Sequence, residues 1–598
     1  MKTKLTILIT LLILLVSCDD ILDKNPRGLY YKDLVWSDSR LIDNVLINCY
    51  SMMSMYNEMQ LGANHFGYTT NDITITATNI ADEATAYWIQ TPKSHWITVE
   101  GGVYEYWNYP VVRELNLFLQ NLENAPVDDN FKTQRSSEAR FLRAYAYFNM
   151  VKRYGGVPLI LKAQTLNDTH EELYPKREKE ENIYRFIIQE MNDIITNKLL
   201  PLSYTNNDTG RPTIWAAAAL KSRAALYAAS IATWGDVKLE GLIGIPNSEK
   251  NYFWQQSLEA SNFIINEGPF VLYNAELPNY TKNYRNIFLV KDNSEVIFAE
   301  KFLSYTGKGH SWDHWQNPRG YNSWGGGQGS CVYLEMVESY ENIDGSNPKI
   351  DRNKILAGHL WTMDELFGKK DPRFKASIYT QDSPWSHYGS PLTLDYHSGI
   401  LKPDGSVTLE SYDGIQPIGY SQQNPWPTPF GILKYLDESI AMAGDRGFSI
   451  TDWILFRLGE IYLNKAEAEF ELGNEEAARN SVNEIRKRAG MPQYNSPITL
   501  DEIRRERKIE LAFEGNRYFD VRRWRTAVKD LSNAYHGLRY ILDAESYGSG
   551  TQKYKVEITE NVAGSNPVPY FENKHYYLPI SKSRTTANPN LVENPEYK

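Results

Sequence analysis

The chain is 598 residues long and 42% of them are hydrophobic, which is enough for several domains or for one large helical body with insertions. Its net charge of −11 argues against nucleic acid as a partner, because that role needs a basic surface. Three cysteines are too few for a disulfide scaffold, and Cys49 and Cys331 are expected to be buried free thiols. The 15 Trp and 41 Tyr combine a flat apolar face with a polar group, which suits sugar rings as well as protein cores.

Residues 1–17 have the order of a secretory signal, with Lys2 and Lys4 before an apolar run over 5–16. The run is shorter than the ~20 residues that a membrane-spanning helix needs, which makes a single membrane helix the weaker alternative. The sequence Leu15-Val16-Ser17-Cys18 resembles the lipobox of bacterial lipoproteins, which implies cleavage before Cys18 and a diacylglycerol anchor on its thiol. Residues 18–36 are polar and without periodicity, so they are predicted to be a tether.

Residues 37–292 are predicted to form an N-terminal helical region, interrupted by a Thr-, Asn- and aromatic-rich loop over 62–102. Ser37 is the expected N-cap of the first helix, and Gly155-Gly156 ends the strongest one. Apolar residues at helical spacing predict further helices over 106–122, 137–154, 181–195, 215–231 and 254–265.

Residues 293–452 change character, because Gly, Pro, Trp, Asn and Ser become frequent and helical periods become few. Short strands are expected here, such as 296–300. A loop-rich insertion of this length is uncommon in a compact domain unless it carries function, so it is predicted to form the ligand face.

Residues 453–598 return to helix, with predicted helices over 453–472, 475–488 and 500–514. The first two resemble a tetratricopeptide repeat, in which small residues let two helices approach and aromatic residues fill the gap. Earlier pairs at 137–195 and 215–265 are candidate degenerate copies of it. The predicted fold class is therefore mainly α: tetratricopeptide-like repeats form one right-handed helical body, which carries the loop-rich insertion with its short strands.

Glu506, Glu510 and Glu514 lie at i, i+4 and i+8, on one face of a predicted helix. A glycosidase could use a carboxylate pair, but acids one turn apart on a single helix are poorly placed to flank a sugar bond. Arg and Lys residues within 504–525 offer each acid a partner, so a structural charge network is the favoured interpretation.

Other signals for chemistry are weak. His310 and His314 with Asp313 have tolerable metal spacing but no further ligand nearby, and the Gly-rich run at 325–329 lacks the strand and helix of a phosphate loop. No Gly-x-Ser-x-Gly elbow is present. The chain is therefore predicted to have no catalytic residue, no metal and no cofactor.

Aromatic residues gather in the predicted loops. Aromatic faces stack on pyranose rings, and Arg or Asn side chains hold hydroxyls. Each single Trp could instead fix a loop to the helical body, but the cluster as a whole favours binding. The predicted ligand-binding residues are Trp88, Trp96, Trp312, Trp315, Arg319, Tyr321 and Trp324.

With these motifs the whole chain resembles the SusD/RagB family of outer-membrane nutrient-binding lipoproteins. Asp371-Pro372-Arg373-Phe374 matches a recurrent motif of that family's insertion, and residues 506–524 match its most distinctive helix. The other matching stretches are residues 18–23, 139–145, 153–159, 457–463, 466–468, 577–580, 587–591 and 594–595.

The resemblance implies a helical body with a loop-built ligand face, held at the outer surface of the outer membrane by the lipid on Cys18. It further implies a non-catalytic protein that captures oligosaccharides and delivers them to a SusC-like TonB-dependent transporter. Two alternatives stay open at this point: a peptide-binding importer subunit of the same family, and a surface glycosidase. The family's ligand residues are not fixed by motif, so the site rests on the loop aromatics alone.

Overall fold

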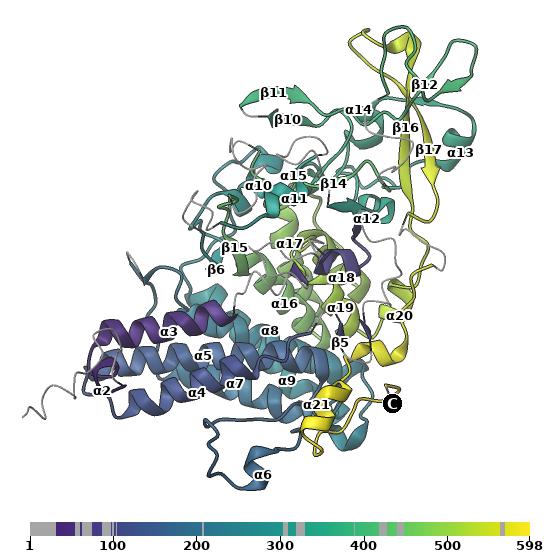
Figure 1. Ribbon diagram of the computed structural model, residues 1–598. Coiled ribbons are helices and arrows are strands. Elements are labelled where there is room, and N and C mark those ends of the chain that lie inside the picture. Colours follow the sequence, from purple (N-terminus) through teal and green to yellow (C-terminus); the bar gives the residue numbers. More distant parts are fainter. Residues whose placement is uncertain are drawn as a thin grey trace, which may run out of the picture.

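The computed structural model describes residues 32–53, 60–61, 75–86, 97–98, 101–102, 105–205, 208–302, 309–318, 329–387, 389–417, 427–438, 448–562 and 568–597. The protein is mainly helical with small sheets, as the sequence predicts (Figure 1). Among these residues, no helix is both long enough and apolar enough to cross a membrane.

Long helices packed side by side form the lower half of the molecule in Figure 1. Each packs on the next, and α9 packs on α16 although some 190 residues separate them along the chain. The N-terminal and C-terminal helical regions therefore make one body. In order, its helices are α3 (Ser39–Met53), α4 (Tyr109–Glu123), α5 (Asp129–Tyr154), α7 (Glu180–Thr196), α8 (Ile214–Trp234), α9 (Lys250–Glu267), α16 (Leu458–Glu471) and α17 (Glu475–Ala489).

Local signals explain these helix bounds. Asp128 caps the backbone N–H of Phe131, so α5 begins well before the predicted residue 137, and it ends at Gly155 in the left-handed region. The Ala-rich α8 is buried along most of its length, because small side chains let its neighbours approach from several sides. Cys49 on α3 and Cys331 are both buried thiols, as predicted.

The insertion begins with β6 (Val296–Glu300), as predicted, and this strand pairs antiparallel with β15 (Trp453–Arg457). The prediction of a helix over 453–472 was wrong at its start, since α16 begins only at Leu458. All five residues of β15 are buried. A short apolar run of this kind has no periodicity that separates a buried strand from a buried helix.

Two larger sheets occupy the upper half of the molecule in Figure 1. A four-stranded sheet has the order β3 (Ala84–Ala86), β7 (Ser330–Val332), β14 (Gly431–Ile432), β9 (Ile378–Tyr379). A five-stranded sheet has the order β13 (Val407–Thr408), β12 (Gly399–Leu401), β16 (Gly537–Asp543), β17 (Tyr554–Thr559), β8 (Leu360–Trp361). Strands β16 and β17 come from the C-terminal region, so the second sheet joins that region to the insertion.

The other elements are short. The helices among them are α2 (Lys32–Val35), α6 (His170–Leu173), α10 (Tyr280–Leu289), α11 (Trp312–Gln316), α12 (Leu334–Ser339), α13 (Arg352–Leu356), α14 (Met363–Phe367), α15 (Pro372–Ser377), α18 (Leu500–Glu510), α19 (Arg517–Arg523), α20 (Ala527–Asp530) and α21 (Lys582–Ala587). Single 3-10 turns are η3 (Ala77–Ile80), η6 (Leu239–Gly241), η7 (Asn247–Glu249), η8 (Ala544–Ser546) and η9 (Asn573–Tyr576). Isolated strand pairs are β1 (Gln60–Leu61) with β2 (Ile75–Thr76), β4 (Ile97–Thr98) with β5 (Gly101–Gly102), and β10 (Pro384–His387) with β11 (Ser390–Thr393).

A buried charge network joins the insertion to the helical body. Glu510 on α18 accepts hydrogen bonds from Arg457 (2.7 Å) and Arg373 (2.9 Å), and it is fully buried. Burial alone would raise the pKa of this carboxyl, but the adjacent guanidinium groups of Arg488, Arg457 and Arg373 hold it well below its ordinary value. The wider network also contains Glu295, Asp371, Lys434, Arg486, Glu506 and Glu514.

This network confirms the structural interpretation of the three acids on α18 and its following turn. Each of them faces basic side chains from the insertion, from β15 or from α17. A second buried group of ion pairs, Arg223–Glu460, Arg507–Asp520 and Arg523–Glu467, joins α8, α16, α18 and α19.

Candidate ligand-binding face

The four-stranded sheet brings together the ends of the two predicted aromatic loops. Ala86 at the end of β3 pairs with Ser330 at the start of β7. The backbone N–H of Gly329 donates to the carbonyl of Trp315, 2.7 Å away. The segment that contains Trp88 therefore starts beside the point where the chain returns after residues 319–328. We refer to this sheet together with α11 as the frame.

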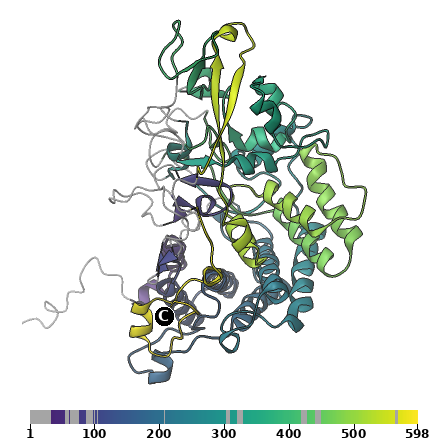
Figure 2. The same cartoon turned by 90° about the vertical axis from the view of Figure 1, so that its right-hand side faces the viewer.

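Further loop ends meet at the frame. His310 and Ser449 form an isolated bridge with backbone hydrogen bonds of 3.0 Å in both directions. Next to the sheet, the N–H of Val332 donates to the carbonyl of Phe430 at 2.9 Å. In Figure 2 purple strands of the N-terminal region lie beside teal strands of the insertion, in line with the pairing of β3 and β7. The described ends of several segments that are far apart in the sequence therefore lie together at the frame.

Only two of the seven predicted ligand residues lie within the described part of the chain. Trp312 and Trp315 lie on α11 and are 2% and 8% exposed. The other predicted residues, Trp88, Trp96, Arg319, Tyr321 and Trp324, lie outside the described residues, as does the lipidation candidate Cys18.

The burial of Trp312 and Trp315 favours a packing role, whereas their prediction as ligand-binding residues requires a face that a sugar ring can reach. The indole N–H of Trp312 donates to the carbonyl of Lys434 at 3.0 Å, and its ring contacts the rings of Tyr435 and Trp453. Tyr435 and Trp453 are themselves stacked, with centroids 4.5 Å apart. Trp312 therefore fixes α11 to β15, which is the packing role that the sequence analysis left as the alternative for single tryptophans.

We expect Trp312→Phe to lower the free energy of unfolding by about 1–2 kcal/mol, because the buried carbonyl of Lys434 loses its donor. Chemical denaturation measures this change. Binding of any glycan that the protein recognises should stay within about twofold of wild type, since less than 0.5 kcal/mol is lost at the ligand. A loss of affinity at unchanged stability would instead indicate direct stacking.

A buried polar cluster links the sheet of the frame to α11 and to η3. Ser330 accepts hydrogen bonds from the side-chain amides of Asn79 and Gln316, both at 3.1 Å. The hydroxyl of Tyr379 donates to the carbonyl of Gln316 at 2.7 Å, and a Cβ on Gly431 would meet the Tyr379 ring at 2.0 Å. Sequence reasoning missed this cluster, because its members come from four separate parts of the chain and none carries a local motif.

His310 and Asp313, which have tolerable spacing for a metal site, are buried and make local contacts instead. Nε2 of His310 lies 2.9 Å from the carbonyl of Thr451, and burial lowers the pKa of this imidazole to about 4. Burial, with Asp437 nearby, raises the pKa of Asp313 well above its ordinary value. Within the described ranges, no group of three or more His, Cys, Asp or Glu side chains is placed to hold a metal ion.

Comparison with known proteins decides the family. The model described as "SusD family" matches residues 294–597, about half of the chain. The chain belongs to the SusD family. A second model, described as "Starch-binding associating with outer membrane", matches residues 21–226. Proteins of the SusD family bind ligands without catalysis, so this SusD family member is a binding protein and not an enzyme.

Similar SusD-like proteins cover the whole chain. A SusD-like protein of Bacteroides ovatus is 25% identical over 100% of this chain and 98% of its own length. The starch-binding protein SusD of Bacteroides thetaiotaomicron is 30% identical over 25% of this chain and 22% of its own length.

Solved structures share the fold. The crystal structure of a SusD-like protein from Bacteroides fragilis has a TM-score of 0.72 at 24% identity and covers 96% of this chain and 100% of its own. A laminarin-binding SusD-like protein has a TM-score of 0.57 at 19% identity, with 93% and 99% covered.

Proposed function

We propose that this SusD family member captures oligosaccharides at the cell surface and delivers them to a SusC-like TonB-dependent transporter. Family membership is the observation that carries the proposal. The second matching model describes starch binding at the outer membrane, and similar proteins are described as starch-binding, laminarin-binding or surface glycan-binding. The lipobox-like end at Cys18 supports an outer-membrane lipid anchor that faces the extracellular side.

The proposed ligand face consists of the loop aromatics Trp88, Trp96, Tyr321 and Trp324 with Arg319, carried by the frame. The frame supports this assignment because it holds the described ends of both loops next to each other. Its buried Trp312, Trp315 and Ser330 cluster gives the loops a fixed base, and a fixed base lowers the entropy cost of ordering a binding site.

The helical body is proposed to be built of tetratricopeptide-like pairs in a right-handed arrangement. The pair α16 and α17 supports this, because Ala466 and Ala478 are fully buried in a common cluster with Val482. Stacked pairs of this type bury their apolar faces on each other and form an extended scaffold for a ligand face.

Replacing Trp88, Trp96, Tyr321 and Trp324 together by Ala is expected to weaken glycan binding by more than about tenfold, or 1.4 kcal/mol, because the stacking surfaces are lost. A glycan array with the form that starts after Cys18 identifies the ligand, and isothermal titration calorimetry measures the affinity. Exposed Tyr547→Ala, directly after the η8 turn, serves as the matched aromatic control.

Unchanged affinity in the fourfold variant would contradict the assignment of the face. A protein that binds no glycan on the array but binds sequences on a peptide array would support the peptide importer instead. Co-purification of the full chain from membranes tests the transporter partner separately.

A further inference from the structure

A pocket of about 230 Å³ lies apart from the frame, between the start of α8 and the strand pair β6–β15. All of its lining residues lie in the described ranges 202–204, 209–215, 269–301 and 452–454. Its volume is smaller than the roughly 300–1,000 Å³ of pockets that hold drug-sized ligands. The space therefore fits one ring rather than a chain of rings.

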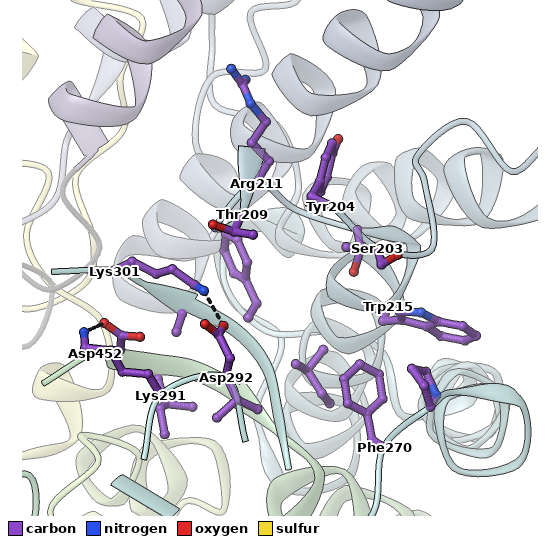
Figure 3. Close-up of a pocket in the computed structure, with 18 of the residues that line it drawn as sticks. Ser203, Tyr204, Thr209, Arg211, Trp215, Phe270, Lys291, Asp292, Lys301 and Asp452 are labelled. Carbon is purple, nitrogen blue, oxygen red and sulfur yellow. Dashed lines mark hydrogen bonds and ion pairs between the residues drawn. The ribbon is translucent and has the colours of Figure 1, made fainter. Parts of the chain in front are cut away.

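One side of the pocket is aromatic. Trp215 and Phe270 stand edge to face with centroids 6.1 Å apart, and Figure 3 shows both at the same side of the space. The indole N–H of Trp215 donates to the carbonyl of Leu202 at 3.1 Å, which fixes the indole ring. Phe288 and Phe298 complete the apolar lining.

The opposite side is polar and charged. Lys301 and Asp292 form an ion pair across the pocket from Phe270, and the side chain of Asp292 remains 68% exposed. Lys291 and Asp452 form a second pair beside it. Ser203 lies beside Trp215 on the aromatic side, whereas the hydroxyl of Tyr204 and the guanidinium of Arg211 point away from the space (Figure 3). Both of these groups bind Glu138, the Tyr204 hydroxyl by donating to it at 3.2 Å.

We propose that this pocket is a second sugar subsite, in which one pyranose ring lies with a C–H face on Phe270 and its hydroxyls at the Lys301–Asp292 pair. A pyranose matches the lining because it has an apolar face and a polar edge on the same small ring. A carboxylate and an ammonium together accept from and donate to neighbouring hydroxyls, and these hydrogen bonds to charged groups are the stronger ones. The subsite rests on the proposed glycan-binding function.

Contacts made at the adjoining ends of β6 and β15 connect the subsite to the frame. Lys301 is followed by Phe302, whose N–H donates to the carboxylate of Asp452 at 3.1 Å and whose ring contacts His310. Asp452 in turn precedes Trp453, which packs on Trp312. The wall of the pocket and the base of the ligand face are therefore parts of one rigid unit, placed to hold two portions of bound glycan at a fixed separation.

Saturation-transfer NMR and calorimetry with a panel of methyl pyranosides test the proposal on the form that starts after Cys18. Phe270→Ala and Asp292→Asn are each expected to weaken pyranoside binding about tenfold, which is ~1.4 kcal/mol. Asp292 has a φ of +52°, a conformation that Asn also tolerates, so this exposed variant should fold normally. Tyr547→Ala is the matched control and should leave pyranoside binding unchanged.

Pyranoside binding that is absent from wild type, or that both pocket variants leave unchanged, would overturn the subsite. Stronger occupancy of the pocket by N-acetyl-leucinamide than by any pyranoside would also overturn it, in favour of a peptide side chain. The fourfold loop variant separates the two proposals. If it abolishes oligosaccharide binding while pyranosides still bind, both proposals stand; if it abolishes oligosaccharide binding but the pocket variants leave pyranoside binding unchanged, the subsite alone fails.

Discussion

Glu510→Ala is expected to lower the free energy of unfolding by about 3–5 kcal/mol, the cost of removing one partner from a buried ion pair. The carboxylate of Glu510 is fully buried and pairs with Arg373, Arg457 and Arg488. Without it, three guanidinium groups from α15, β15 and α17 keep their mutual repulsion and lose a common acceptor. These elements belong to both the insertion and the helical body. We therefore expect the variant to unfold in one cooperative transition, and not to lose the structure of the insertion first.

Urea unfolding followed by circular dichroism measures this loss. Glu476→Ala is the matched control, because Glu476 is 83% exposed and pairs with its helix neighbour Arg479 at 3.5 Å; such surface pairs contribute about 0–1 kcal/mol. A cost for Glu510→Ala as small as that of the control would mean that the network does not hold the two parts together.

The buried carboxyl of Glu83 is expected to make the protein less stable as the pH rises from about 4.5 to 7. Burial raises the pKa of Glu83 to about 7, with Asp82 adding to the effect, although Oε1 accepts the N–H of Phe513 at 2.9 Å. The native state therefore holds this proton more tightly than the unfolded chain does. The stabilisation is complete below pH 4.5, declines as the pH rises, and is lost above about 7, a change of up to about 3 kcal/mol.

Glu83→Gln tests this pH dependence, because the amide oxygen can still accept from Phe513 and the side chain carries no charge at any pH. The free energy of unfolding of wild type minus that of Glu83→Gln should fall between pH 4.5 and 7.5 and then stay constant. Exposed Glu476→Gln provides the comparison. Parallel stability curves for wild type and Glu83→Gln would show that Glu83 does not titrate in this range.

Local sequence signals were sufficient to predict most helices of the helical body. Helix α7 begins and ends within one residue of the predicted 181–195, since its apolar stripe is regular. The early start of α5 was missed because residues 129–136 are polar and only the cap at Asp128 marks them. Strand β15 was missed because its five buried residues form a strand by pairing with β6, which lies some 150 residues away in the sequence.

The aromatic ligand face stays a prediction, and the sequence could not assign it residue by residue. Aromatic enrichment selected loops whose described ends meet at the frame, yet it could not reveal that Trp312 is buried. Burial of one tryptophan depends on Tyr435 and Trp453, and no single sequence reveals that these three rings pack together. The role of Arg373 was hidden for the same reason, since Glu506 and Glu510 lie more than 130 residues further along the chain.

The direct passage of β15 into α16 has a mechanical consequence. Arg457 ends the strand and Leu458 begins the helix, with no turn between them to serve as a hinge. Trp453 at the start of the strand packs on Trp312, and α16 packs on α9. The strand and the helix therefore move together as one rigid element. Arg457 also clamps the junction, because it binds Glu295, Glu510 and Glu514. A displacement of β15 is therefore passed directly to α16 and, through its packing on α9, to the helical body.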